Sequence, residues 1–283
     1  MKIDVRNIPS SYDGFNYLAS LDHRLRDLNG EEIVLDFENT RWISGNMCAT
    51  FGAILCRIEN KSNRIRMENI SGKTFDLLSK NGFLTQYGSE PRKDTFRSTI
   101  TYQRFGTPEV QKFAIYVEKH IKGKGIPEMS NALSKEFRRG ICEIFENSVF
   151  HAESKLGVFS CGQYFPKREK MDFCVTDLGM GIPENVRRFK KMNLDDSRAI
   201  DWAMSGRSTT KSSSVPGGLG LKLLREFIEK NAGRILVASG RGYWELSGSN
   251  VVTKRLNAPF HGTAVNIEIN TADTKSYFLT SEL

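Results

Sequence analysis

The sequence has few cysteines and lacks a long apolar run. Its 283 residues include five cysteines, none of them spaced as Cys-x-x-Cys. An odd number of scattered cysteines among apolar neighbours predicts buried, reduced thiols and not a disulfide framework. No apolar stretch approaches the roughly 18 to 20 residues that cross a bilayer. The N-terminus also lacks the basic and apolar segments of a signal peptide. We therefore expect a soluble, cytoplasmic protein that does not enter membranes.

Neither sign of charge dominates the chain. Lysine and arginine number 41 against 33 acidic residues, and 39% of the residues are apolar, which is the composition of a folded protein. The basic run Arg187–Lys191 is interpreted as a solvated helix face in preference to a nucleic-acid patch, although that alternative stays open. His23 and His261 have no partner at metal-ligand spacing, so we predict no transition-metal site.

The first ninety residues alternate short strand-like and helix-like segments. Apolar periodicity and turn residues predict strands over 2–8, 32–37 and 64–70, and helices over 15–28, 46–59 and 72–82. Parallel neighbours require crossover connections, so this βαβαβα order favours a small sheet covered by helices, an α/β module. The polar segment 91–106 is the expected linker, although residues 98–102 are strand-like, and 107–283 forms the second domain.

The order and length of the first module resemble a STAS domain. The corresponding run is Leu35-Asp36-Phe37 through Trp42-Ile43-Ser44-Gly45-Asn46. In that family a serine at the start of the helix is a phosphorylation switch, because added negative charge meets the helix dipole. The usual aspartate is missing here, and Ser44 is the serine nearest to that position. We interpret Ser44 as a helix cap in preference to a switch, and we expect the module to bind a protein partner.

A helix in the second half carries two distinct stripes. The segment from Ser134 to Ser154 reads SKEFRRGICEIFENSVFHAES. Its apolar stripe at helical spacing consists of Phe137, Ile141, Ile144, Phe145 and Ser148. Glu143, Asn147 and His151 are spaced four apart, which places them on a second stripe at the edge of the apolar face.

Two glycine-containing segments follow this helix. Residues 170–183 read KMDFCVTDLGMGIP, which predicts a strand whose end delivers Asp177 into a loop containing Gly179 and Gly181. An ionised aspartate can accept a hydrogen bond from an exocyclic amino group, so this loop is a candidate adenine-binding loop. The alternative is an ordinary turn after a strand.

The segment 205–233 reads SGRSTTKSSSVPGGLGLKLLREFIEKNAG and enters a helix near Leu219. Backbone N–H groups at such an entry suit a polyphosphate, and Lys211 could add a mobile positive charge. The alternative is a flexible loop before a helix.

Further on, residues 241–245 are interpreted as a connection between strands, and Phe260 to Ile269 as a turn that feeds an alternating strand.

Taken together, these segments resemble the four boxes of the GHKL ATPases, which include gyrase, the heat-shock-90 chaperones, histidine kinases and MutL. The matching residues are Glu143-x-x-x-Asn147, Asp177-x-Gly179-x-Gly181, Gly218-x-Gly220-Leu221 and Gly262-Thr263. The resemblance spans about half the chain and implies a Bergerat fold, in which an antiparallel or mixed sheet lies under helices. No phosphoacceptor histidine box precedes this domain, which disfavours a histidine kinase.

The resemblance implies a role for each matching residue. Asn147 would coordinate Mg²⁺, and Asp177 would bind the adenine amino group with help from Thr263. Glu143 would orient or activate the attacking water or a protein hydroxyl. The remaining nucleotide contacts would come from His151, Gly179, Gly181, Lys211, Gly218, Leu219, Gly220 and Leu221.

Three functions are compatible with these residues. The first is a slow ATPase whose lid, residues 185–216, acts as an ATP-driven switch on the STAS-like module and its partner. The second is a serine/threonine protein kinase of the anti-sigma-factor type, and the third is a nucleotide-sensing scaffold without turnover. Many GHKL proteins dimerise, but no coiled-coil heptads fix an oligomeric state here, so a homodimer stays open.

Overall fold

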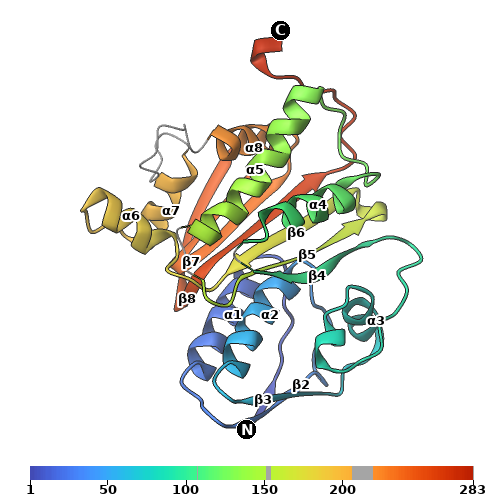
Figure 1. Ribbon diagram of the computed structural model, residues 1–283, viewed down its shortest axis with the longest axis vertical. Coiled ribbons are helices and arrows are strands. Elements are labelled where there is room, and N and C mark those ends of the chain that lie inside the picture. Colours follow the sequence, from blue (N-terminus) through green and yellow to red (C-terminus); the bar gives the residue numbers. More distant parts are fainter. Residues whose placement is uncertain (107, 151–153, 206–218, 283) are drawn as a thin grey trace.

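Two β-sheets organise the molecule (Figure 1). The computed structural model describes residues 1–106, 108–150, 154–205 and 219–282. Within these residues a three-stranded parallel sheet has the order β1-β2-β3, and a five-stranded sheet has the order β4-β5-β6-β8-β7. Every pair of neighbours in the larger sheet is antiparallel. The chain is therefore a mixed α/β protein whose larger sheet is antiparallel, one of the two arrangements expected from the sequence.

The N-terminal module has the predicted βαβαβα order. Its elements are β1 (Lys2–Asp4), α1 (Tyr12–Leu25), β2 (Glu32–Asp36), α2 (Met47–Glu59), β3 (Arg64–Glu68) and α3 (Gly72–Lys80), followed by the 3₁₀ turn η1 (Leu84–Tyr87). Ile33 and Leu35 of β2 are fully buried, because both side chains pack under the helices that connect the strands.

The second half of the chain forms the larger sheet and the helices around it. Its strands are β4 (Thr99–Phe105), β5 (Val158–Phe165), β6 (Lys170–Asp177), β7 (Arg234–Ser247) and β8 (Asn250–Asn270). Its helices are α4 (Val110–Ile121), α5 (Asn131–Phe150), α6 (Ile182–Lys190), α7 (Asp196–Met204) and α8 (Leu219–Lys230), with short 3₁₀ turns η2 (Pro166–Arg168) and η3 (Thr280–Glu282). The segment 91–106, expected to be a linker, contains β4, which pairs with β5.

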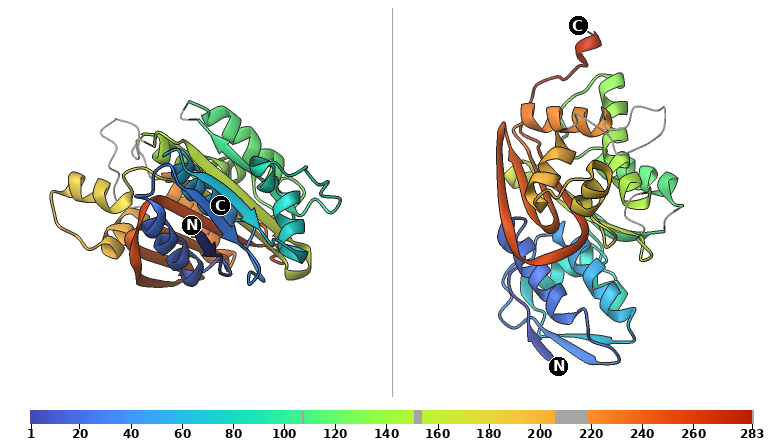
Figure 2. Two further views of the ribbon diagram at one scale, coloured as in Figure 1. Left: turned by 90° about the horizontal axis from the view of Figure 1, so that it is seen from below. Right: turned by 90° about the vertical axis from the view of Figure 1, so that its left-hand side faces the viewer.

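Helices α1 and α2 lie between the two sheets, and we call them the inter-sheet helices (Figure 2). One apolar core runs from Leu35 of β2 through Phe51 of α2 to Phe159 of β5. Helix α2 is buried around most of its circumference, and its Gly52 is needed because a Cβ there would lie 2.3 Å from the hydroxyl of Tyr102. A helix that is apolar on all sides is stable only when it is covered on all sides, which explains why α2 lies between the two sheets.

The opposite face of the larger sheet is covered by α4, α5 and α8. The five residues predicted as the apolar stripe of α5 are all buried, which confirms that prediction. Phe113 of α4 stacks on Phe145 of α5 with the ring centroids 4.4 Å apart. Phe137 of α5 meets Phe227 of α8 at 5.0 Å. The larger sheet therefore has helices on both faces.

The expectation that residues 241–245 connect two strands is wrong, because these residues lie inside β7. Tyr243 and Trp244 are both fully buried, but they belong to different cores, one on each face of the sheet. Because both faces are covered, this stretch lacks the polar and apolar alternation that marks an ordinary antiparallel strand.

The interpretation of Ser44 as a helix cap is also wrong. Helix α2 begins after Asn46, and no side chain caps it. The Ser44 hydroxyl oxygen instead accepts hydrogen bonds from the backbone N–H of Ser10 at 3.0 Å and from Nε1 of Trp42 at 3.1 Å. Ser44 is 5% exposed, so it is a buried tie between loops and not an accessible hydroxyl.

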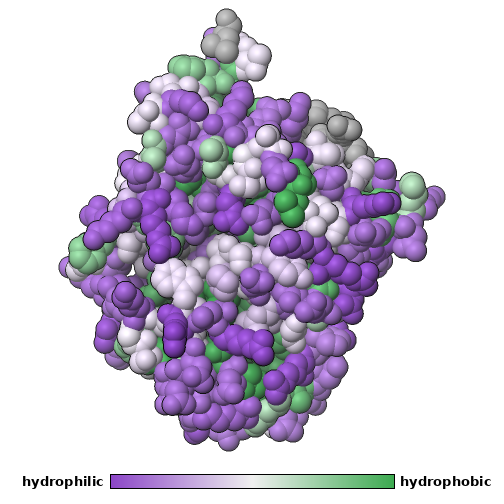
Figure 3. Space-filling model, turned by 180° about the vertical axis from the view of Figure 1, so that it is seen from behind, coloured by the Kyte–Doolittle hydropathy of each residue, from purple (hydrophilic) through white to green (hydrophobic). Residues whose placement is uncertain are grey.

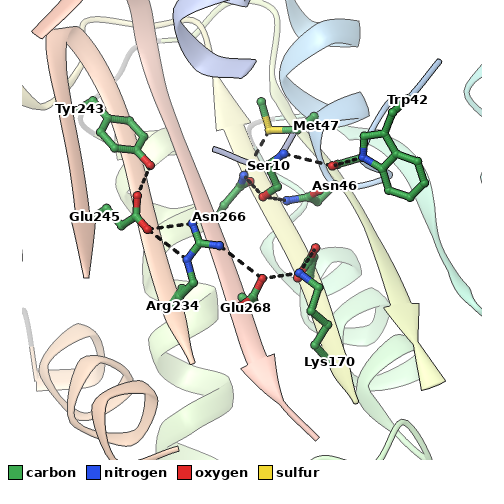
Figure 4. Close-up of polar contacts among 12 residues, drawn as sticks. Ser10, Trp42, Asn46, Met47, Lys170, Arg234, Tyr243, Glu245, Asn266 and Glu268 are labelled. Atoms are coloured by element: carbon green, nitrogen blue, oxygen red, sulfur yellow. Dashed lines mark hydrogen bonds and ion pairs between the residues drawn. The ribbon is translucent and has the colours of Figure 1, made fainter. Parts of the chain in front are cut away.

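Polar contacts continue across the larger sheet beside the inter-sheet helices (Figure 4). Lys170 of β6 binds Glu268 of β8 at 2.5 Å, and Arg234 binds Glu245 at 2.8 Å. Further along, the Asn46 amide donates to the hydroxyl of Ser10 at 2.8 Å. The face that the inter-sheet helices cover thus has an apolar part and a polar part.

The surface seen from behind the view of Figure 1 is mainly hydrophilic, with apolar side chains in small separate groups (Figure 3). None of the helices in the described part of the chain has both the length and the apolar character to cross a bilayer. All five cysteines are free thiols, and Cys48, Cys161 and Cys174 are buried, in line with the sequence expectation.

Candidate functional site

Asp177 ends β6 and is the buried centre of the candidate site. It lies between Val158 of β5 and Thr263 of β8 in the register of the sheet, and it is 1% exposed. The backbone N–H of Gly179 donates to its Oδ1 at 2.9 Å. Burial raises the pKa of Asp177 to about 6, and hydrogen bonds from Gly179, Ser148 and Thr263 oppose that rise. The contact with Ser148 shows that the carboxylate faces α5.

Two glycines let the loop after β6 lie against β7 and β8. Gly181 has φ 82°, and a Cβ there would lie 2.7 Å from the Ser239 hydroxyl oxygen. Gly262 has φ 101°, and a Cβ there would lie 2.2 Å from the Asp177 carbonyl oxygen. Glycine is required at both positions because the backbone is left-handed and the space is filled. These contacts fix the peptide groups around Asp177.

Ser239 of β7 completes this arrangement, and sequence reasoning missed it. Its fully buried hydroxyl donates to the carbonyl of Gly262 at 2.6 Å and accepts from the N–H of Ile182 at 3.0 Å. Its oxygen also lies 3.3 Å from the hydroxyl of Thr263. Ser239 therefore connects the start of α6, directly after the loop that follows β6, to β8. A single serine within a buried strand gives no sequence signal that distinguishes this role.

Helix α5 supplies the two polar residues predicted from its second stripe. Glu143 is buried, and its Oε2 accepts a hydrogen bond from the backbone N–H of Leu221 at 3.2 Å. This bond joins α5 to the first turn of α8. Asn147 lies one turn after Glu143, is half-buried, and directly precedes Ser148, which contacts Asp177.

The structure thus brings several predicted residues to one end of the larger sheet. A hydrogen bond and the strand register connect Asp177 with Gly179 and Thr263, and a separate hydrogen bond connects Glu143 with Leu221. Asn147 lies on α5 between Glu143 and Ser148, which contacts Asp177. Leu219 and Gly220 begin α8, where first-turn N–H groups have no partner within the helix. The predicted residues His151, Lys211 and Gly218 lie outside the described residues.

The described part of the expected lid, 185–205, consists mainly of α6 and α7. Arg187 binds Asp196 at 2.7 Å, and Asp196 accepts from the N–H of Arg241 at 2.6 Å, which anchors α7 to β7. Arg188 pairs with Glu184 at 2.9 Å. Both arginines of the basic run are therefore paired with acidic residues, as on a solvated charged helix. The rest of the expected lid, 206–216, lies outside the described residues.

Few described side chains at this end of the sheet could bind a metal ion. Among the described residues, no three His, Cys, Asp or Glu side chains are grouped to hold a metal ion. Asn147 would be one oxygen ligand, and Mg²⁺ characteristically uses few protein ligands together with waters and phosphate oxygens. Asn147 is thus the predicted residue that would hold such an ion.

A scan of the chain against protein-family models gave no match, and a search of curated proteins found no relative.

Proposed function

We propose that this end of the larger sheet binds Mg·ATP and that the chain is an ATP-driven regulatory switch with slow hydrolysis. The observation that carries the proposal is Asp177, a carboxylate 1% exposed and fixed by the Gly179 N–H at 2.9 Å. A buried carboxylate is costly unless it serves an interaction, and an adenine amino group is a matching donor. Its resemblance to the adenine-binding aspartate of the GHKL ATPases supports the same assignment.

The contact between Glu143 and Leu221 supports the phosphate assignment. The Leu221 N–H belongs to the first turn of α8, where the helix dipole favours an anion. A carboxylate oxygen already accepts a hydrogen bond from this amide, which supports its ability to bind an anionic group. A phosphate bound at α8 would compete for the amide and leave the Glu143 carboxylate able to orient a water or a hydroxyl.

The inter-sheet helices supply a route from this site to the N-terminal module. The hydroxyl of Thr50 on α2 lies 2.9 Å from that of Thr176, the residue before Asp177. A nucleotide that shifts the end of β6 would alter this buried contact and bias the position of α2. The partner of the N-terminal module would then respond to the nucleotide state.

Hydrogen exchange measured with and without Mg·ATP tests the switch. We expect added protection at α5, at the loop after β6 and in α2, because the ligand and the inter-sheet helices share β6. Protection confined to α5 and that loop would leave ATP binding intact but contradict the switch. Incubation with γ-labelled ATP separates the chemical alternatives: free phosphate supports the ATPase, labelled protein supports a kinase, and neither product supports a sensor.

A further inference from the structure

The outer edge of β3 has unpaired peptide groups. The Arg64 N–H donates to the carbonyl of Glu31 at 2.8 Å, and the Glu68 carbonyl accepts from the N–H of Phe37 at 2.9 Å. Successive residues of a strand direct their peptide groups to opposite sides, so those of Ile65 and Met67 point away from β2. They make no hydrogen bond within the described part of the chain. The next strand, β4, belongs to the larger sheet, so among the described residues no strand pairs with this edge.

A cavity of about 530 Å³ lies along this edge. One wall is β3 itself, and the others include Ile70, Phe75 of α3, and Leu84 and Tyr87 of η1. These four side chains are large and mainly apolar, and Asn69, Gln86 and Ser89 also line the cavity, so it offers apolar and polar side chains beside free backbone donors and acceptors. Such a combination is what an extended peptide needs in order to add a strand to a sheet.

The charges that line the cavity favour a peptide that carries a basic residue. Arg66 is already paired, with Glu68 at 2.6 Å and with Glu32 at 3.8 Å. Glu59, at the Ile65 end, has no ion pair among the described residues, and partial burial raises the pKa of its carboxyl. The uncompensated charge at that end of the cavity is therefore negative.

We propose that the β3 edge binds an extended segment of a partner protein by strand addition. Alternate apolar side chains of that segment face Phe75 and Tyr87, and a lysine or arginine faces Glu59. A second copy of this chain fits less well. Antiparallel pairing of two β3 strands through both free peptide groups would place Arg66 opposite Arg66 of the second copy. This proposal does not depend on the nucleotide site.

A random nonapeptide library displayed on phage and panned against the full chain tests the proposal. We expect selected peptides with alternating apolar residues and a basic residue near one end, measured afterwards as synthetic peptides by fluorescence anisotropy. Met67→Pro removes one outward N–H and should weaken binding about tenfold, whereas Met67→Leu keeps it and should bind like the wild type. Glu59→Gln should weaken the basic peptides, but not the same peptides with the basic residue replaced by threonine.

A second measurement keeps the proposal testable if Met67→Pro fails to fold, which circular dichroism would show. Methylation of successive peptide nitrogens in a selected peptide should weaken its binding to the wild type at alternate positions only. No enrichment of alternating peptides would overturn the proposal, as would equal effects of methylation along the peptide. A wild-type dimer in light scattering that Met67→Pro dissociates would also overturn it, in favour of a second copy.

Discussion

Thr50 of α2 and Thr176 of β6 join the N-terminal module to the larger sheet through buried hydroxyl groups whose oxygens are 2.9 Å apart. Thr176 directly precedes Asp177, and neighbouring strand residues face opposite sides of a sheet. On one side of β6 the Asp177 carboxylate therefore faces α5. On the other side Thr176 contacts α2, one of the inter-sheet helices. The N-terminal module therefore contacts the residue that directly precedes Asp177.

Removing the Thr50 hydroxyl should loosen this contact. Thr50→Val keeps the side-chain shape but leaves the buried Thr176 hydroxyl with one partner fewer, which should lower the free energy of unfolding by about 1 kcal/mol. Urea denaturation followed by circular dichroism measures the loss. Thr50→Ser retains the hydroxyl and serves as the matched control. A loss in Thr50→Ser with none in Thr50→Val would assign the effect to packing of the methyl group and contradict a role for the hydrogen bond.

Gly262 should be far less replaceable than a glycine with space around it. Gly248 also has a positive φ, 55°, but nothing lies within 4 Å of a Cβ added there. Gly248→Ala should therefore cost about 1 kcal/mol for its backbone conformation alone. Gly262→Ala adds a clash with the Asp177 carbonyl and should cost about 3 kcal/mol. Similar unfolding midpoints for the two variants would show that β8 does not lie tightly against the loop after Asp177.

Asp172 should contribute a loss of stability as the pH rises from about 4 to about 7, and the lowered pKa values of the buried His120 and the half-buried His261 act in the opposite direction. The pKa of Asp172 is raised to about 7, mainly by burial; Lys170 opposes the rise and Glu268 adds to it. The native state then holds a proton that the unfolded chain has already released, so ionisation above pH 4 costs native stability. Burial of Asp177 acts in the same direction up to about pH 6. Urea midpoints measured across this range report the slope.

Asp172→Asn is the variant that isolates this effect. It removes the titrating group, so raising the pH from 5 to 7 should favour the folded state of the variant relative to that of the wild type. Asp177→Asn should retain the Asp172 part of the slope near pH 7. A wild-type slope in Asp172→Asn would mean that the Asp172 carboxyl is not buried as described.

Much of the local structure follows from sequence periodicity. The order of the N-terminal elements and the apolar stripe of α5 were both predictable, because apolar residues recur at the spacing of helices and strands and turn residues separate the elements. The end of β6 at Asp177 was also predictable, since an alternating segment runs directly into Gly179 and Gly181.

The packing of the two halves was not predictable in this way. Met47 to Ile58 of α2 is apolar on almost every side, which indicates burial but not which surfaces cover the helix. Tyr243 and Trp244 were misassigned because both sides of β7 are covered and the residues do not alternate. Ser239 acts through strands that are distant in the sequence, and single residues of this kind carry no local signal.

Isothermal titration of Mg·ATP into the wild type and into Asp177→Asn tests whether Asp177 binds the adenine of ATP. We expect saturable binding by the wild type and a loss of about tenfold or more in Asp177→Asn, because an amide donor would then face the adenine amino group. Asn147→Ala should weaken Mg·ATP binding but change nucleotide binding little when magnesium is absent. Undiminished affinity in Asp177→Asn, or no binding by the wild type, would contradict the account.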